Sequence, residues 1–229
     1  MALDGGARPL THGLSSASWG RIVFLEDPVC DGCGVGFEFE QGPGALCAAC
    51  MTSRHAFARA RAACVYDEHS RDLILKLKHA DRTDLAPLLA RWLSRAAAPL
   101  LIECDAVAPV PLHWRRLIAR RYNQAAELAR PLARHAGRRY LPAALVRRRA
   151  TGTQGGKSGR GRRENVRAAF AVPRASIKHV EGRRILLVDD VLTTGATLDA
   201  CAKTLLAAGA SAVDVAVVAR VQAAAQLAI

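Results

Sequence analysis

Two adjacent carboxylates and the loop after them are the most chemically informative feature of this 229-residue chain. Asp189 and Asp190 end the run "RRILLVDD", and "TTGAT" follows at 193–197. The apolar run predicts a strand covered on both faces, and residues 195–210 predict a helix. The loop therefore lies at a helix N-terminus, where backbone amides and the helix dipole favour an anion.

The loop has the residue types of a phosphate cradle. Gly195 permits close backbone approach, and hydroxyl donors come from Thr193, Thr194 and Thr197, with Ala196 between them. Carboxylates repel phosphate, so the two aspartates must serve another part of the same ligand, and each can accept hydrogen bonds from vicinal hydroxyls. A ribose 5-phosphate meets both requirements. Carboxylates beneath its ring would also stabilise an oxocarbenium-like transition state.

Three other interpretations of these patterns explain the residues less well. "ILLVDD" also opens receiver domains, but those need a later aspartate strand and a lysine, and too little chain follows residue 190. "GTQGGKSG" (152–159) is similar to a Walker A loop, yet that pattern needs glycine where Thr151 stands. It also follows "RRRAT" rather than an apolar strand. The third interpretation is that the aspartates simply mark a solvated strand end. This is common for a single aspartate and less so for two that are followed by "TTGAT".

Four of the seven cysteines form a C-x2-C-x13-C-x2-C pattern: Cys30, Cys33, Cys47 and Cys50. Four thiolates suit tetrahedral zinc in a closed structural site, which leaves no open position for catalysis. A redox dithiol is the alternative, and the presence of two pairs favours the metal. Cys64, Cys104 and Cys201 lie on apolar elements and are expected in the core.

The remaining pattern alternates between strands and helices. Strands are predicted at 60–67, 104–111, 182–190 and 211–221, and helices at 70–80, 84–100, 123–137 and 195–210. This alternation predicts an α/β fold with a doubly wound, mostly parallel sheet. Ligands bind such sheets at the carboxyl ends of the strands, where the aspartates stand. We expect a flexible segment over 1–27, a cysteine module over 28–55 and the α/β domain over 56–229.

Composition restricts the class of protein. Hydrophobic residues make up 51% of the chain, which excludes a disordered protein, and the net charge of +13 favours polyanionic partners. Residues 147–167 hold eight Arg or Lys and one Glu, or +7 of that charge. No apolar run approaches the roughly 20 residues of a membrane span. The N-terminus lacks a signal-peptide pattern, so a cytoplasmic location is expected.

The run "ILLVDDVLTTGAT" (185–197) resembles, along its whole length, the phosphoribosyl pyrophosphate (PRPP) signature of type I phosphoribosyltransferases. The chain adds "APVPLHWRRLIARRYNQAAELAR" (108–130), "TGTQ" (151–154), "RRENVRAAF" (162–170) and the two cysteine pairs. Together these segments resemble the ComF/GntX family, over about residues 28–221. Members of that family are competence-associated and carry a zinc-ribbon-like N-terminus on a phosphoribosyltransferase domain.

The resemblance implies the ligand PRPP with Mg²⁺, held by Asp189 and Asp190 at the ribose and by 193–197 at the 5-phosphate. "PVPLHWRR" (109–116) corresponds to the pyrophosphate loop, with Pro111, His113, Arg115 and Arg116 as its candidates. "RRRATGTQGGKSGRGRRENV" (147–166) corresponds to a flexible loop that closes over the site, with Arg148, Gln154, Arg162 and Asn165. Closure would exclude water and limit PRPP hydrolysis. The alternative interpretation is that both segments are solvent-exposed basic loops with no ligand-binding role.

Two departures bear on the activity. "GGKSG" follows the TxxQ glutamine where the family usually has an aliphatic residue, which leaves the roles in that loop open. Thr193 stands where purine-transferring relatives commonly hold an acid, which argues against purine salvage because threonine cannot act as a base there.

Two functions therefore remain. The first is phosphoribosyl transfer from PRPP to an unidentified acceptor. The second is non-catalytic binding of PRPP, a nucleotide or single-stranded DNA within the DNA-uptake machinery. No acceptor base is recognisable, and aromatic residues are only 5% of the chain, which weakens a base-stacking surface. The oligomeric state is open, a dimer included.

Overall fold

A computed structural model describes residues 19–79, 82–114, 117–118, 121–148 and 169–222. Within them, a five-stranded sheet has the order β1-β7-β6-β2-β3, and all of its pairings are parallel. The strands are β1 (Ala60–Val65), β2 (Ala106–Pro109), β3 (Arg139–Tyr140), β6 (Arg184–Leu192) and β7 (Ala212–Arg220). A separate antiparallel pair joins β4 (Val146–Arg147) to β5 (Phe170–Ala171).

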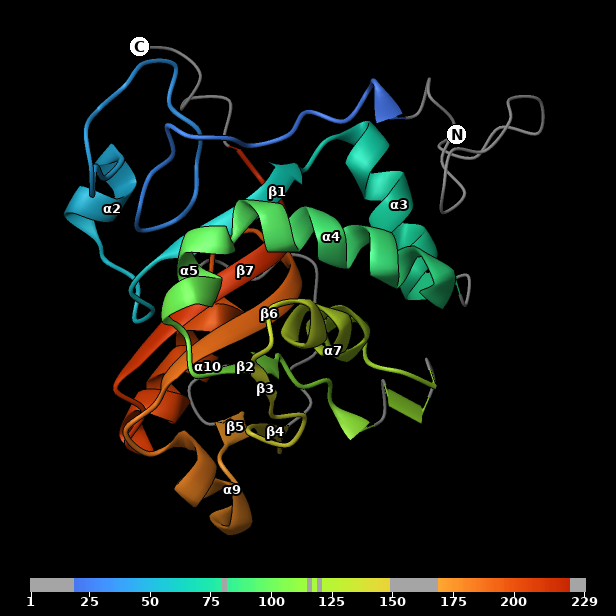
Figure 1. The fold of residues 1–229 in the computed structure, drawn as a ribbon, viewed down its shortest axis with the longest axis vertical. Helices are drawn as coiled ribbons and strands as arrows, with labels where there is room; N and C mark the ends of the chain where they lie inside the picture. The colour runs from blue at the N-terminus through green and yellow to red at the C-terminus, as the bar shows by residue number, and fades with distance from the viewer. Residues whose placement is uncertain (1–18, 80–81, 115–116, 119–120, 149–168, 223–229) are drawn as a thin grey trace.

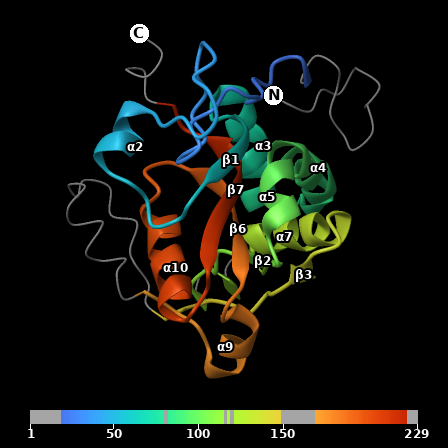
Figure 2. The ribbon, with the colours of Figure 1, turned by 60° about the vertical axis from the view of Figure 1, so that its left-hand side comes forward.

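Helices cover both faces of the sheet, as Figures 1 and 2 show. One face carries α3 (Glu68–His79), α4 (Ala86–Ala96), α5 (Ala98–Glu103) and α7 (Gln124–His135), with the short η1 (Thr83–Leu85) before α4. The other face carries α10 (Ala196–Ala207), and α9 (Arg174–Val180) lies beyond the end of the sheet. The predicted doubly wound α/β fold is confirmed. No helix in these residues has the length and apolar content to cross a membrane.

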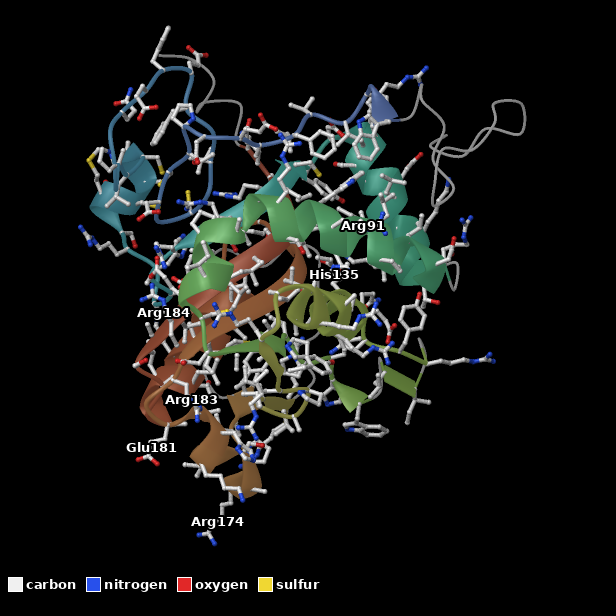
Figure 3. The ribbon with its side chains drawn as sticks, in the orientation of Figure 1. Arg91, His135, Arg174, Glu181, Arg183 and Arg184 are labelled. Carbon is white, nitrogen blue, oxygen red and sulfur yellow. The ribbon has the colours of Figure 1, made fainter. Side chains whose placement is uncertain are left out.

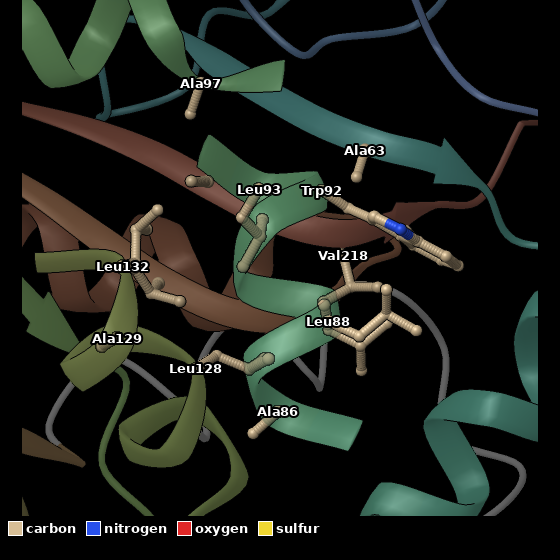
Figure 4. Packing of buried hydrophobic residues seen from close by; sticks show 14 of the residues in the cluster. Ala63, Ala86, Leu88, Trp92, Leu93, Ala97, Leu128, Ala129, Leu132 and Val218 are labelled. Atoms are coloured by element: carbon tan, nitrogen blue, oxygen red, sulfur yellow. The ribbon is translucent and has the colours of Figure 1, made fainter. Parts of the chain in front are cut away.

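Alternating side chains of β6 divide the core into two layers. Leu186 and Val188 belong to the cluster that packs under α4 and α7, part of which Figure 4 shows. Ile185 and Leu187 belong to the cluster that packs against α10. The alternation follows from the two-residue period of a strand. Cys64, Cys104 and Cys201 are fully buried in these two clusters, as predicted.

The structure differs from the sequence expectation in three ways. The helix expected over 84–100 divides at Ala97, because Pro99 in the first turn of α5 has no N–H to continue the ladder from α4. The strand expected to end at Asp190 continues to Leu192 with β7 as its partner. The short elements α9, β3, β4 and β5 gave no periodic signal, since most span only two residues.

The cysteine module rests on the edge of the sheet at β1. Gly34 has a φ of +69°, and a Cβ at this position would lie 3.0 Å from the Ala60 carbonyl oxygen. The backbone amide of Ala60 donates to the Asp31 carbonyl at 3.2 Å, and Arg61 Nη2 lies 2.7 Å from Asp31 Oδ1. Only glycine permits this combination of conformation and close approach. The module, with α2 (Ala48–Thr52), is therefore docked by backbone contacts.

A buried carboxylate ties the amino-terminal edge of the sheet together. Asp214 on β7 is fully buried and accepts hydrogen bonds from Arg184 Nε at 2.7 Å and Arg59 Nη2 at 3.3 Å. Arg59 Nη1 and Nη2 also donate to the exposed Glu103 carboxylate, at 2.9 and 2.8 Å. Arg184 lies near the end of α5 (Figure 3). Two cations thus compensate one buried anion.

Replacing Asp214 with alanine should leave two arginine side chains without their buried partner. We expect a loss of about 3–5 kcal/mol in the free energy of unfolding, or about 10 °C in melting temperature for a domain of this size. Thermal melts followed by circular dichroism measure it. Glu103→Ala, the control, removes an exposed partner of the same arginines and should change the melting temperature little. Equal losses in both variants would contradict the assigned role of Asp214.

Candidate functional site

The two aspartates lie where β6 extends beyond one of its neighbours. β2 pairs with β6 only as far as Pro109 and Val188, whereas β7 continues alongside to Leu192. The last contact on the β2 side is the Val110 amide, which donates to the Val188 carbonyl at 2.9 Å. Asp189 and Asp190 therefore stand at the carboxyl edge of the sheet, where no strand among the described residues pairs with β6 on the β2 side. This is where parallel α/β sheets bind ligands.

The two carboxylates have unequal environments. The backbone amide of Asp190 donates to Asp189 Oδ1 at 2.9 Å. Burial, together with the charge of Asp190, raises the pKa of Asp189 to about 7, although Lys78 and Arg147 oppose the rise. Asp189 therefore exchanges its proton near neutral pH, whereas Asp190 is held by a cation.

That cation is Lys78, which sequence reasoning missed. Its Nζ lies 2.9 Å from Asp190 Oδ2, and both side chains are mostly buried. Lys78 belongs to α3, more than 100 residues earlier in the chain, and the Tyr122 hydroxyl holds this helix by donating to the Leu77 carbonyl. The sequence showed Lys78 only as a polar position of an amphipathic helix. No spacing rule connects it to the aspartates.

The loop at 193–197, predicted to cradle a phosphate, lies at the N-terminus of a helix, where an anion would be favoured. Gly195 is buried, has a φ of +78° and caps the N-terminus of the twelve-residue helix α10. Thr193 and Thr194 are exposed, while Ala196 and Thr197 are half-buried at the start of the helix. The Gly195 carbonyl accepts the Asp199 amide at 2.8 Å, which starts the helical ladder. The structure thus places the aspartates and the cradle on one continuous strand–loop–helix unit.

The segment predicted to meet pyrophosphate continues from the end of β2. Pro111 and His113 are buried, and His113 forms a parallel bridge with Arg147. Asn123 Nδ2 donates to the Val110 carbonyl at 3.0 Å, and its Oδ1 accepts the Ala125 amide at 3.1 Å, so it joins this segment to α7. The end of β2 therefore lies beside the acidic pair. Arg115 and Arg116 are outside the described residues.

The predicted closing loop is described only at its borders. Arg148 is exposed, and its amide donates to the Ala169 carbonyl at 2.7 Å, which extends the β4–β5 pair. Gln154, Arg162 and Asn165 lie outside the described residues. Arg147, which entered the sequence analysis only as part of a basic run, proves to be close enough to influence Asp189.

The four cysteines predicted to bind metal converge. Their Sγ atoms all lie within 4.8 Å of one another, and all four side chains are buried. The Cys47 amide donates to Cys30 Sγ at 3.2 Å, the kind of contact that stabilises a thiolate. Four sulfurs at this separation fit the tetrahedral donor set of structural zinc. A hydrogen bond with Cys33 raises the pKa of Cys30 to about 12, so metal binding here must release protons.

Comparison with known proteins defines the class of the larger domain. The profile of the phosphoribosyl transferase domain family matches residues 123–227, which include β6, the aspartates and the cradle. Among solved structures, the glutamine PRPP amidotransferase of B. subtilis is similar over 63% of this chain and 30% of that chain, with 23% identity and a TM-score of 0.43. Residues 123–227 therefore carry a phosphoribosyl transferase domain, and the four-cysteine cluster precedes them in the chain.

Two curated relatives extend over nearly the whole chain. DNA utilization protein YhgH of Escherichia coli (strain K12) is 32% identical, over 88% of this chain and 91% of the relative. Competence protein F of Haemophilus influenzae is 30% identical, over 86% of this chain and 92% of the relative. This chain belongs to the ComF family, which confirms the resemblance found in its motifs.

The raised pKa of Asp189 predicts a pH-dependent stability. An aspartate ordinarily titrates near pH 3.9, so the folded protein holds this proton more tightly than the unfolded chain. Wild-type stability should fall as the pH rises from about 4 through 7, and Asp189→Asn should escape that loss. At pH 8 we expect the variant to be more stable by on the order of 4 kcal/mol, and at pH 4 by nearly nothing.

Urea unfolding at a series of pH values measures the difference. Glu38→Gln is the matched control, since Glu38 is exposed and distant in sequence from the site. A constant difference between wild type and Asp189→Asn from pH 4 to pH 8 would contradict the shifted pKa.

Proposed function

We propose that this protein binds PRPP with Mg²⁺ and transfers its phosphoribosyl group to a nucleophile. The observation that carries the proposal is the placement of two adjacent carboxylates, one of them paired with Lys78, directly before a glycine-capped helix N-terminus on one strand–loop–helix unit. A phosphate monoester and a vicinal diol must then belong to one ligand. The family profile over 123–227 supports this ligand class.

Each part of the site has a role in this proposal. Asp189 and Asp190 hold the ribose hydroxyls, and residues 193–197 bind the 5-phosphate through amides and hydroxyls. Lys78 and the His113 segment, continued by Arg115 and Arg116, supply positive charge beside the pyrophosphate. Arg148, Gln154, Arg162 and Asn165 close over the bound ligand. Bound together with PRPP, Mg²⁺ would supply charge neutralisation for the pyrophosphate leaving group. The side chains of Asp189 and Asp190 would stabilise the positive charge that develops on the ribose.

We also propose that Cys30, Cys33, Cys47 and Cys50 hold a structural zinc ion in a module over 28–55, apart from the transferase domain over 56–229. The buried tetrad supports this, because four sulfurs fill the tetrahedral shell and leave no position for substrate. The metal would stabilise a segment too short to build a core of its own.

Non-catalytic binding of single-stranded DNA is the second candidate, and the names of the relatives favour it. A DNA utilization protein and a competence protein both match over nearly their full length. A role in DNA uptake from the cytoplasmic side is compatible with either candidate. The two differ in what the basic segment 147–167 contacts: the compact pyrophosphate, or an extended phosphate backbone.

PRPP with Mg²⁺ should raise the melting temperature of the wild-type protein by about 5 °C or more at 100 times its Kd, because a ligand that binds only the folded state stabilises it. Asp189→Asn combined with Asp190→Asn should abolish this rise and leave the unliganded protein folded. Differential scanning fluorimetry with PRPP–Mg²⁺, nucleotides, free bases and single-stranded DNA measures both effects.

An equal rise in the double variant would remove the ribose assignment. A rise with single-stranded DNA and none with PRPP would instead favour the second candidate. Glu38→Gln again serves as the control, with an expected rise equal to that of wild type.

Metal analysis should find about one zinc ion per chain. Cys30→Ser or Cys50→Ser should lose that zinc and expose the module to protease, because metal binding and folding share one free energy there. Cys104→Ala, which removes a buried cysteine outside the tetrad, should keep the zinc. Full zinc content in both serine variants would disprove the four-cysteine site.

A further inference from the structure

The cysteine module contacts the phosphate cradle at both of its ends. Residues 193–197 connect β6 to α10, and nothing in that short connection requires a partner from residues 30–55. The structure nevertheless brings one side chain to the start of the cradle and one to its glycine. These side chains are Arg220, at the end of β7, and His55, which follows the last cysteine by five residues.

Arg220 links the module to the start of the cradle. Its Nε donates to the Cys33 carbonyl at 3.1 Å. Its Nη1 donates to the Thr193 carbonyl at 3.0 Å and lies 3.4 Å from the Leu192 carbonyl. One guanidinium group therefore joins the backbone of a metal-site cysteine to the first residue of the cradle. Because a guanidinium is planar and rigid, a shift of either backbone segment strains the other contact.

His55 fixes the other end. Its Nδ1 lies 3.1 Å from Asp199 Oδ2 in the first turn of α10, and the Ala56 amide donates to Asp199 Oδ1 at 2.8 Å. The imidazole stacks on Phe57, with ring centroids 4.5 Å apart. The ring also lies against Gly195, since a Cβ there would approach His55 Cε1 to 2.8 Å. The glycine conformation of the cradle is thus packed directly against the chain that leaves the cysteine module.

From these contacts we propose that the four-cysteine module holds the phosphate cradle in its binding conformation through Arg220 and His55. Metal occupancy of Cys30, Cys33, Cys47 and Cys50 then sets the affinity for phosphate. Arg220 depends on the position of Cys33, and His55 is five residues from Cys50. Loss of the metal would free both contacts. The expected effect on phosphate affinity rests on the proposed function, namely that residues 193–197 bind the 5-phosphate of PRPP.

A cavity between the module and the sheet supports this reading. It has a volume of about 190 Å³ and is lined on one side by module residues such as Gly32, Leu46 and Cys50, and on another by Val213. Side-chain packing is therefore incomplete behind His55. The polar contacts of His55 and Arg220, rather than a continuous apolar interface, must carry the connection to the cradle.

Amide hydrogen exchange of residues 193–198, followed by mass spectrometry, tests the proposal without any ligand. We expect His55→Ala and Arg220→Met to exchange about tenfold faster there than wild type while keeping full zinc content. Zinc removal by a chelator should have the same effect in wild type and little further effect in a variant that combines His55→Ala with Arg220→Met. His55→Asn, which keeps a donor for Asp199, should retain part of the protection. His135→Ala, on the exposed side of α7 (Figure 3), is the matched control.

Titration with PRPP–Mg²⁺ by calorimetry then measures the consequence. Both variants should bind about tenfold more weakly than wild type, in step with the lost protection. Unchanged exchange at 193–198 in His55→Ala and Arg220→Met would overturn the inference, whatever the affinities. Faster exchange in the variants, with no PRPP binding by wild type, would sustain the coupling and instead reject the proposed ligand. The two failures are therefore distinguishable.

Discussion

The structure depends on the placement of two carboxyl groups side by side at a mostly buried strand end. Burial penalises the ionised form of Asp189, and the neighbouring charge of Asp190 adds to that penalty, which is why the pKa of Asp189 is raised to about 7. The fold compensates with Lys78 at 2.9 Å from Asp190 and with Arg147 nearby. Buried carboxyl groups with a shifted pKa are found most often at functional sites, so this pair is expected to contact a ligand.

The surrounding elements are arranged around that requirement. β6 extends past β2 and so exposes one edge beside the aspartates, while β7 continues to support the other edge. The Tyr122 hydroxyl fixes α3 and with it Lys78, and Asn123 fixes the end of β2. At the amino-terminal end of the strands, the buried Asp214 carboxylate is neutralised by hydrogen bonds from Arg184 and Arg59. The ion-paired Asp214 and the aspartate pair therefore lie at opposite ends of the same two strands, β6 and β7.

Local pattern predicted much of this arrangement. The strand–loop–helix unit at 185–207 and the four cysteines were recognisable because their chemistry lies within short spacings. Lys78, His55 and Arg220 were not, because each acts through a contact made by the tertiary fold over more than 25 residues. The break at Ala97 was readable in principle from Pro99. Two-residue strands such as β3 form only because β2 offers an edge, so no periodicity precedes them.

Two glycines mark the contacts that connect the cysteine module to the sheet and to the cradle. Gly34 and Gly195 both have positive φ, and at each a side chain would collide with a partner from another part of the chain: the Ala60 carbonyl for Gly34 and the His55 ring for Gly195. A side chain at Gly34 would press on the β1 backbone that docks the module, and a side chain at Gly195 would press on the His55 ring. Both glycines therefore lie on the path from the cysteine tetrad to the phosphate site. A chain in which the module served only its own stability would need the first of these contacts and not the second.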